Sequence, residues 1–515
     1  MAQPAQRAEW LPAPLAWIAL ALAFGGLAAH ALAGFQGAYL TYGSGVWLSL
    51  AGDLAGHGVF YRDLVGDLGY GGTRYFPFFF VTIAGFLKAG FSPAVAGLTA
   101  GGLSIVVLAI GAYRIVRAAG IPPLTAAVFA AAAAGPYFAL QAAFEVRADV
   151  MAAGLNLLGI ALVLDAWRSS GLQDNPRILP AALAFLLAFA TKVTAFTIPG
   201  ALVLAALLTG RRRLAARLAL ALVVGGVVFL GIVQAASGGR AFRVLGAVMF
   251  GGANPAGTVL SVVSGGYLSG LFNSHLVIAA MLFAVVTLVA GGMFRRSADP
   301  AMPLPLAVPF ALWLAATATL GVTLSSPGTV PANQVVEWLA ISMVVPALVG
   351  AARMNTRRVG AFVAAVMVLW MGAQNAARGR ERAPLLTREH RAEERAFVDR
   401  VRAFDGPILA ESALWPVLAG REVVMPDAFA ARIVLREHPE IESRLVAEIE
   451  ARHYRGIVLE FDPSSREGEA MYGFSHFSPR VIAAVRAHYR LEIPGQSIGF
   501  VFVPRTDQSS KSKND

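Results

Sequence analysis

The sequence predicts a polytopic α-helical membrane protein with about eleven to thirteen transmembrane helices and a small C-terminal α/β soluble domain. Hydrophobic residues make up 57% of the 515 residues and charged residues only 14%, whereas a soluble domain carries about 25% charged residues. Apolar runs of about 20 residues, each long enough to cross a bilayer as a helix, recur from the N-terminus to residue 374. Arginine clusters separate these runs. Together these observations favour a membrane bundle over any soluble fold.

The distribution of basic residues along the chain reflects the topology of a membrane protein. The net charge is +11, which by itself could indicate nucleic-acid binding, but the arginines gather in turns between apolar runs. The clusters are Arg114 with Arg117, Arg168 with Arg177, Arg211 to Arg213 with Arg217, Arg295 with Arg296, and Arg353 with Arg357 and Arg358. Cytoplasmic loops of membrane proteins carry this excess, so no nucleic-acid partner is expected. The absence of cysteine excludes disulfides and thiolate chemistry.

The first element is an apolar helix near residues 10–33. It ends in "AHALAG", which is similar to a signal-peptide cleavage site, but its apolar stretch exceeds the roughly 7–15 residues of a signal peptide. We therefore expect a retained helix. The polar stretch 34–75 that follows forms the first outer loop, and alternating apolar residues in "GVWLSLAGDLAGHGVF" indicate a helix lying in the membrane interface.

Further spans are expected up to residue 374. They lie near 95–113, 122–143, 150–166, 178–190, 193–209, 214–235, 268–293, 303–323, 335–351 and 358–374. The segment 76–92 is the exception. If it crossed the membrane alone, Arg114 and Arg117 would face outward, against the charge rule. We expect it to be re-entrant or paired with a further helix.

The composition changes near residue 380. We divide the chain into a transmembrane domain at 1–376, a linker helix at 377–400, an extracytoplasmic α/β domain at 401–506 and a disordered tail at 507–515. Within the α/β domain, "GPILAES", "RGIVLEF" and "GFVFVP" are typical of short strands, and 439–453 and 479–489 of helices.

Ionisable residues gather at the predicted outer ends of the spans. Because a charged side chain in a membrane protein is costly, each of them is a candidate functional residue. In "FEVRADV", Glu145 and Asp149 lie four residues apart with Arg147 between them. A carboxylate kept ionised by a cation can accept a proton from an acceptor hydroxyl. The alternative is an ordinary charged helix end in solvent.

The first outer loop offers a second group of candidates. Asp53 and Asp63 lie in it, and Arg74 and Tyr75 begin "RYFPFFF". A guanidinium binds phosphate through two hydrogen bonds, and the aromatic run can hold an isoprenoid chain. The alternative is an interfacial aromatic belt with an arginine that reaches the surface.

Three further polar residues adjoin apolar spans. Lys192 lies in "FATKVTAF", where it either reaches the surface or pairs with an anion. Asn333 and Glu337 lie in "PANQVVEW" at the outer start of a span, where an acid at a helix N-terminus is the simpler explanation. No histidine has the spacing of a metal site.

This layout resembles the GT-C superfamily of polyprenyl-phosphate-dependent membrane glycosyltransferases, near the bacterial protein mannosyltransferases and aminoarabinose transferases. The similar segments are "GVWLSLAGDLAGHGVFYRDL", "YGGTRYFPFFF", "EVRADVMAAGLNLLGIALVL" and "PANQVVEWLA". The resemblance implies an inverting glycosyltransferase of the bacterial inner membrane, acting at the outer face. It also implies a polyprenyl-phosphate-linked sugar as donor, a glycan, lipid or protein as acceptor, and contact with membrane lipids.

The resemblance also implies site roles. The family base is an acid in the first outer loop, within an Asp-Glu pair about eight positions before the alanine that matches Ala51; this chain has Gly43 and Ser44 there. Asp149 matches the second outer acid, so Asp63, Glu145 and Asp149 become candidate bases. Arg74, Tyr75, Arg147, Lys192, Asp53, Asn333 and Glu337 become candidate substrate-binding residues. Some members use a divalent cation, for which this sequence provides no separate motif.

Two other functions remain open. A transporter or flippase of lipid-linked sugars typically shows inverted repeats and broken helices, and the hairpin at 178–209 is the one segment of that kind. A non-catalytic protein of envelope polysaccharide assembly is consistent with the missing Asp-Glu pair. Transfer of sugar from a purified donor separates these readings.

Overall fold

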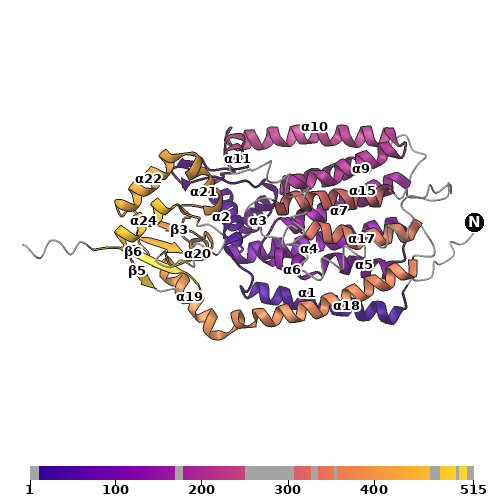
Figure 1. The fold of residues 1–515 in the computed structure, drawn as a ribbon, viewed down its shortest axis with the longest axis horizontal. Coiled ribbons are helices and arrows are strands. Elements are labelled where there is room, and N and C mark those ends of the chain that lie inside the picture. The colour runs from indigo at the N-terminus through magenta and orange to yellow at the C-terminus, as the bar shows by residue number, and fades with distance from the viewer. Residues whose placement is uncertain are drawn as a thin grey trace, which may run out of the picture.

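A computed structural model shows a long helical bundle with an α/β domain at one end (Figure 1). The structure describes residues 11–168, 178–249, 307–325, 335–352, 357–463, 476–493 and 498–506. The span expected at 268–293, the candidate residue Asn333 and the expected tail 507–515 lie outside these ranges.

Five described helices are long and apolar enough to cross a membrane. They are α1 (Ala13–Phe35), α4 (Pro93–Ala118), α7 (Asp149–Arg168), α10 (Arg212–Ala236) and α18 (Arg357–Arg382). Each overlaps a predicted span, and the prediction of a polytopic helical membrane fold is confirmed. The helix α7 packs against α4 and against α8 (Ile178–Thr191), which places it inside the bundle.

The remaining apolar helices are shorter or bent. A 62° bend joins α5 (Pro123–Ala134) to α6 (Tyr137–Phe144). The break falls at Gly135 and Pro136, because proline lacks the N–H that would continue the helical ladder. The others are η1 (Val193–Phe196), α9 (Thr197–Leu208), α15 (Ala307–Ser325) and α17 (Val336–Ala352).

The short length of α3 (Phe78–Lys88) removes the conflict between the segment 76–92 and the rule that basic residues lie in the cytoplasm. The helix has 11 residues, so it is about 17 Å long against a hydrocarbon core of about 30 Å. A helix this short does not cross alone, and α4 can then carry its arginines to the opposite end. There Arg114 pairs with Asp165 of α7 at 3.4 Å, and Arg211 donates to the carbonyl of Trp167 at 2.6 Å.

The segment 34–75, named the outer loop after its predicted side of the membrane, contains the expected short helix. This helix, α2 (Tyr42–His57), ends at Gly58, whose φ of 69° suits a left-handed helix cap. A hairpin of β1 (Val65–Gly66) and β2 (Gly69–Tyr70) follows. Across the loop lies α11 (Ala241–Met249), which packs against α21 of the C-terminal domain.

The C-terminal domain follows the linker η3 (Ala383–Leu386) and α19 (Arg388–Arg402). Its sheet has the order β3-β4-β6-β5, with β3 (Ile408–Ala410) parallel to β4 (Gly456–Leu459) and the other pairs antiparallel. The last two strands are β6 (Phe500–Pro504) and β5 (Tyr489–Ile493), and the helices are α20 (Leu414–Leu418), α21 (Ala428–Glu437), α22 (Pro439–Glu450) and α24 (Pro479–His488). The three predicted strands are present, and β5 is an addition.

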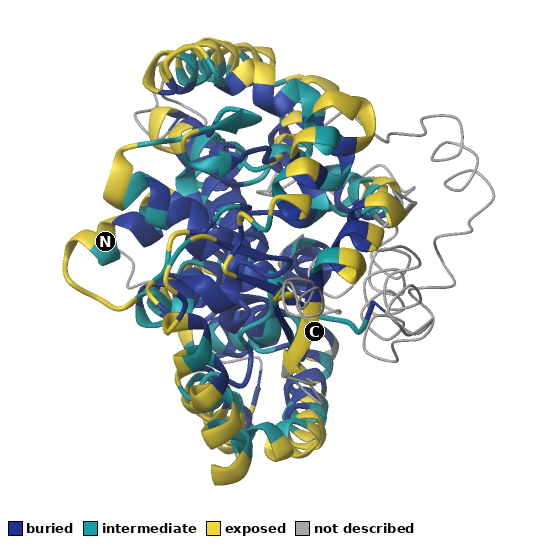
Figure 2. Ribbon diagram, turned by 90° about the vertical axis from the view of Figure 1, so that its left-hand side faces the viewer, coloured by how far each residue is buried: buried dark blue, intermediate teal, exposed yellow. Residues whose placement is uncertain are grey.

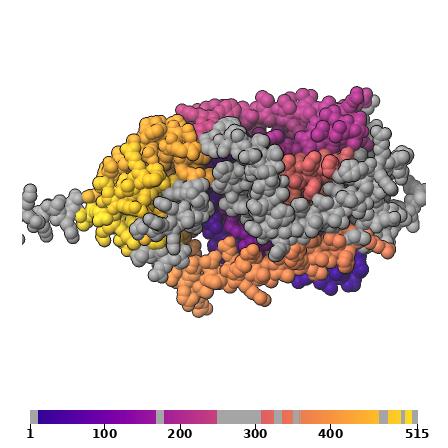
Figure 3. Space-filling view, viewed as in Figure 1, coloured from indigo at the N-terminus to yellow at the C-terminus, as the bar shows by residue number. Residues whose placement is uncertain are grey.

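Burial separates the inside of the bundle from its surround. Dark blue residues fill the centre in Figure 2, whereas the outer faces of the peripheral helices are yellow. On α10 these exposed residues are large and apolar, including Val223, Val227 and Ile232, as a lipid-facing helix requires. The C-terminal domain abuts the end of the bundle in the space-filling view (Figure 3).

Candidate functional site

The turn between α6 and α7 has strained backbone. Val146 has a φ of 56° and is fully buried. A β-branched residue is a genuine outlier in this region of φ, and such strain persists where the surroundings enforce it, often at functional sites. The two neighbours of Val146 are the predicted site residues Glu145 and Arg147. Two predicted site residues therefore flank a strained and buried turn.

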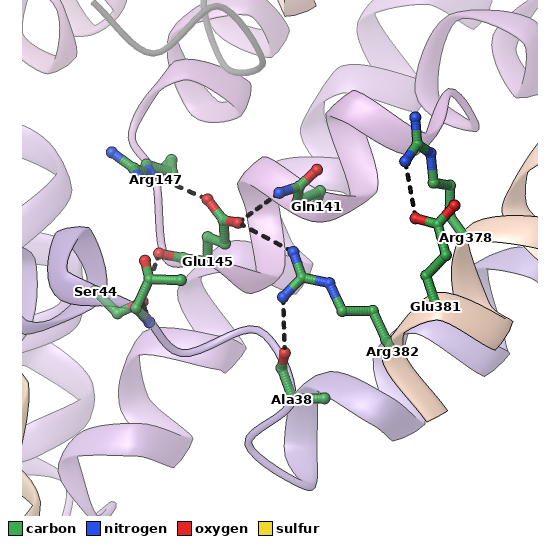
Figure 4. A network of polar contacts seen from close by, with 9 residues as sticks. Ala38, Ser44, Gln141, Glu145, Arg147, Arg378, Glu381 and Arg382 are labelled. Carbon is green, nitrogen blue, oxygen red and sulfur yellow. Dashed lines mark hydrogen bonds and ion pairs between the residues drawn. The ribbon is translucent and has the colours of Figure 1, made fainter. Parts of the chain in front are cut away.

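Glu145 is held by three side chains, as Figure 4 shows. Gln141 Nε2 donates to Glu145 Oε1 at 2.6 Å, and Arg147 Nε donates to Oε2 at 3.3 Å. Arg382, at the end of α18, approaches Oε1 to 4.0 Å and donates to the carbonyl of Ala38 at 3.4 Å. Both oxygens of Glu145 are already engaged.

Gly43 and Ser44, which stand where the family has its Asp-Glu pair, lie beside the turn at Glu145. Ser44 Oγ donates to the backbone carbonyl of Glu145 at 2.8 Å, so the start of α2 is fixed to the strained turn. A Cβ at Gly43 would lie 2.6 Å from the guanidinium carbon of Arg147. Arg147 therefore fills the space that a family acid at residue 43 would occupy.

Asp149 and Lys192 form an ion pair, with Lys192 Nζ 2.5 Å from Asp149 Oδ1. Asp149 is the first residue of α7, and Lys192 occupies the break between α8 and η1. The Asp149 side chain is 11% exposed and the Lys192 side chain 26%, so the pair is partly open to its surroundings. Of the two alternatives for Lys192, the structure shows pairing with an anion.

Glu337 belongs to the same place. A cavity of about 10 Å³ is lined by Asp149, Lys192 and Glu337, which is room for roughly one water. Asn156 of α7 donates to Glu337 Oε1 at 2.5 Å and to the carbonyl of Ala195 at 3.0 Å. Three predicted residues from α7, the α8–η1 break and α17 therefore converge.

Arg74 and Tyr75 line the joint between the outer loop and the C-terminal domain. Arg74 is exposed, and its guanidinium carbon lies 4.4 Å from the ring centroid of Phe429 on α21. Arg432 stacks on the same ring at 4.9 Å. Tyr75 packs against Trp47, with ring centroids 4.5 Å apart. Sequence reasoning missed Phe429 and Arg432, because only the fold brings them to residues about 350 positions away in the chain.

Asp53 and Asp63 lie in separate ion pairs. Arg62 binds both oxygens of Asp53 at 2.5 and 2.6 Å and donates to the carbonyls of Leu68 and Val423. Because Val423 belongs to the C-terminal domain, this buried pair ties that domain to the outer loop. Asp63 is paired with Arg243 of α11 and lies 3.7 Å from Arg240, which directly precedes that helix.

Metal ligands are sparse in the part of the chain that the structure describes. There, no group of three or more His, Asp or Glu side chains has the arrangement of a metal site. Two acids of the site are instead paired with basic side chains, Glu145 with Arg147 and Asp149 with Lys192. Such pairs suit an anionic ligand and a proton acceptor side by side.

Comparison with known proteins shows the fold. No family model matches the chain, and no curated protein matches its sequence significantly. The crystal structure of ArnT from Cupriavidus metallidurans bound to undecaprenyl phosphate is 14% identical, with a TM-score of 0.55, over 93% of this chain and 98% of that one. The chain has the GT-C fold.

An oligosaccharyltransferase shares this fold. The Archaeoglobus fulgidus oligosaccharyltransferase in complex with Zn and sulfate is 15% identical, with a TM-score of 0.52, over 89% of this chain and 68% of that one. Its apo form gives a TM-score of 0.51, over 94% of this chain and 75% of that one. At these identities the likeness establishes the GT-C architecture and leaves the roles of individual residues to the geometry of this chain.

Proposed function

We propose that this GT-C protein is an inverting glycosyltransferase that moves a sugar from a polyprenyl-phosphate carrier to an envelope glycan, lipid or protein. The ArnT neighbour was solved with undecaprenyl phosphate bound, which supports a carrier of that class. The observation that carries the proposal is the convergence of Asp149, Lys192 and Glu337 on one cavity beside the strained turn.

Asp149 is the proposed base. The oxygen of the acceptor hydroxyl attacks the anomeric carbon and forms the new glycosidic bond, while its proton passes to the Asp149 carboxylate. The bond between the anomeric carbon and the phosphate oxygen breaks, and its electron pair leaves with the polyprenyl phosphate. Lys192 is paired with Asp149 at 2.5 Å and stabilises the charge that develops on the departing phosphate.

Glu145 has a different role in this proposal. Its two oxygens are bound by Gln141, Arg147 and Arg382, so it orients the start of α2 and the acceptor rather than accepting a proton. Asp63 is paired with Arg240 and Arg243 at the start of α11, and we assign it a positioning role in the outer loop.

Arg74 is the proposed recognition residue for the carrier phosphate. It lies at the surface, directly before Tyr75 and the aromatic residues that open α3. Arg432, on the same ring of Phe429, adds a second positive charge from the C-terminal domain. A guanidinium stacked on an aromatic ring keeps its N–H edge available for a phosphate.

The arrangement also supports a location. The basic residues Arg114 and Arg211 lie at one end of α4 and α7, and the candidate site lies at the other end, next to the C-terminal domain. With the basic end in the cytoplasm, the site and the C-terminal domain face outward from the bacterial inner membrane.

The test is transfer of a labelled sugar from a purified polyprenyl-phosphate donor by the full chain in lipid nanodiscs. We expect Asp149→Asn to lower transfer by about a hundredfold or more while the carrier still binds. The matched control is Asp165→Asn, the same change at the other end of α7, which we expect to leave transfer unchanged. Full activity in Asp149→Asn would overturn the assignment of the base, and movement of the intact lipid-linked sugar without transfer would favour a flippase.

A further inference from the structure

A cleft of about 450 Å³ lies outside the proposed reaction site. It opens between the outer loop, from α2 and the β1–β2 hairpin, and the C-terminal domain, from α20 to β4. Its volume falls within the range of small-molecule binding sites, about 300–1,000 Å³. None of its lining residues has a role in the mechanism proposed above.

The floor of the cleft is polar, and its polar groups are hydrogen-bonded to one another. One part is the bidentate pair of Arg62 and Asp53. The other is Glu448, which accepts hydrogen bonds from Tyr70 at 2.8 Å, Tyr454 at 2.5 Å and Arg444 at 3.0 Å. Burial acts to raise the pKa of Glu448, but these hydrogen bonds outweigh burial, and the pKa is lowered from its usual value. The floor is therefore prearranged, and its charges are matched within the protein.

The rim offers polar groups of both kinds. His57, Asp67, Glu422 and His453 line the cleft and are exposed. The lining as a whole carries four carboxylates and three guanidinium groups, so an ionic ligand of either sign gains little net attraction. Carboxylates accept from hydroxyl groups, and guanidinium and imidazole groups donate to them. Apolar side chains and the rings of Tyr70 and Tyr454 lie between these polar groups. This combination suits a neutral molecule rich in hydroxyl groups.

A single rigid element joins the cleft to the reaction site. Ser44, at the start of α2, donates to the carbonyl of Glu145, and Asp53, further along the same helix, lies in the floor of the cleft. Nine helical residues span about 14 Å. An acceptor of several sugar units can therefore reach both places at once.

We propose that this cleft binds the neutral carbohydrate part of the acceptor, at a distance from the hydroxyl that reacts. The inference rests on the proposed glycosyltransferase function and names the class of acceptor, a glycan or a glycan-bearing molecule. Binding remote from the reacting centre can supply the energy that orients the reacting group.

The absence of cysteine makes a clean test available. Glu422→Cys places the only thiol of the chain on the rim of the cleft, and Glu393→Cys places it on the exposed face of α19 as a matched control. The rate of labelling by a fluorescent maleimide is measured on the full chain in nanodiscs. The neutral probes are maltotriose and triacetylchitotriose, and inorganic phosphate is the anionic probe.

We expect a neutral trisaccharide to slow labelling of Glu422→Cys about tenfold at ten times its dissociation constant, by simple mass action. Labelling of Glu393→Cys should not change. Equal protection by phosphate would make the cleft an anion site, and no protection by either trisaccharide at millimolar concentration would overturn the proposal.

The two proposals fail in different ways. Protection by a trisaccharide in a chain that transfers no sugar would keep the carbohydrate site and refute the transferase. Transfer activity without protection would keep the transferase and refute the site. A bulky maleimide on Glu422→Cys should, in the active chain, raise the acceptor KM and leave carrier binding unchanged.

Discussion

Replacing Gly45 by alanine should loosen the contact between the outer loop and the C-terminal domain. A Cβ at Gly45 would lie 2.2 Å from the backbone nitrogen of Leu414 and 2.7 Å from its Cα. Both atoms belong to the start of α20, which packs along α2. Because the obstacle is backbone, no side-chain rotation relieves the overlap. One of the two helices has to move by about 1 Å or more to restore an ordinary contact.

The expected cost follows from two opposing effects. Overpacking of a well-packed contact costs about 1–3 kcal/mol. Alanine gains about 1 kcal/mol over glycine inside a helix, so the net destabilisation is up to about 2 kcal/mol. The matched control is Gly56→Ala near the end of α2, where a Cβ meets nothing within 4 Å. That variant keeps the propensity gain without the clash and should be slightly more stable than the parent.

The assay is limited proteolysis of the linker between α18 and α19, together with thermal unfolding of the full chain in nanodiscs. Gly45→Ala should be cleaved faster and unfold at a lower temperature, and Gly56→Ala should not. If the two variants behave alike, the close approach of α2 and α20 is not what holds the C-terminal domain in place.

Three further predictions concern charges. Burial, with Glu411 nearby, raises the pKa of Glu460 from 4.5 to about 7, so its contribution to stability is full below pH 4.5 and is lost as the pH rises to about 7. Glu460→Gln should therefore be more stable than the parent above pH 7, by up to about 3 kcal/mol, and equal to it at pH 4; a gap that is constant across pH would contradict this. Arg62→Ala should cost about 3–5 kcal/mol in thermal unfolding, because it leaves the buried Asp53 unpaired, and Arg62→Ala with Asp53→Ala should recover part of that loss. Lys192→Met should lower kcat for transfer about a hundredfold with less effect on the acceptor KM; a pure KM effect would remove Lys192 from the reaction.

The local sequence pattern was sufficient to predict much of the architecture. The apolar runs that predicted α4, α7 and α10 are long enough to cross a membrane, and length alone decides such segments. The two acids of "FEVRADV" were recognised from their spacing alone, but the structure gives them separate partners, Arg147 and Arg382 for Glu145 and Lys192 for Asp149. The strand β5 was missed because it follows α24 without a break and carries the charged residues Arg490 and Glu492.

Contacts between distant segments were beyond the sequence. Nothing near Arg74 indicates that Phe429 and Arg432 lie beside it, since the contact depends on how the C-terminal domain docks. The partner of Lys192 was left open for the same reason: Asp149 reaches it only through the packing of α7 against α8. The role of Arg62 likewise depends on a carbonyl 361 positions further along the chain.

The packing of Arg147 over Gly43 couples these two positions. A Cβ at position 43 would lie 2.6–2.8 Å from the guanidinium of Arg147, so any larger residue there displaces that group. The guanidinium is the end of a flexible side chain and can swing aside, but it would then leave its contact with Glu145. The smallness of residue 43 therefore keeps Arg147 in place over the strained turn.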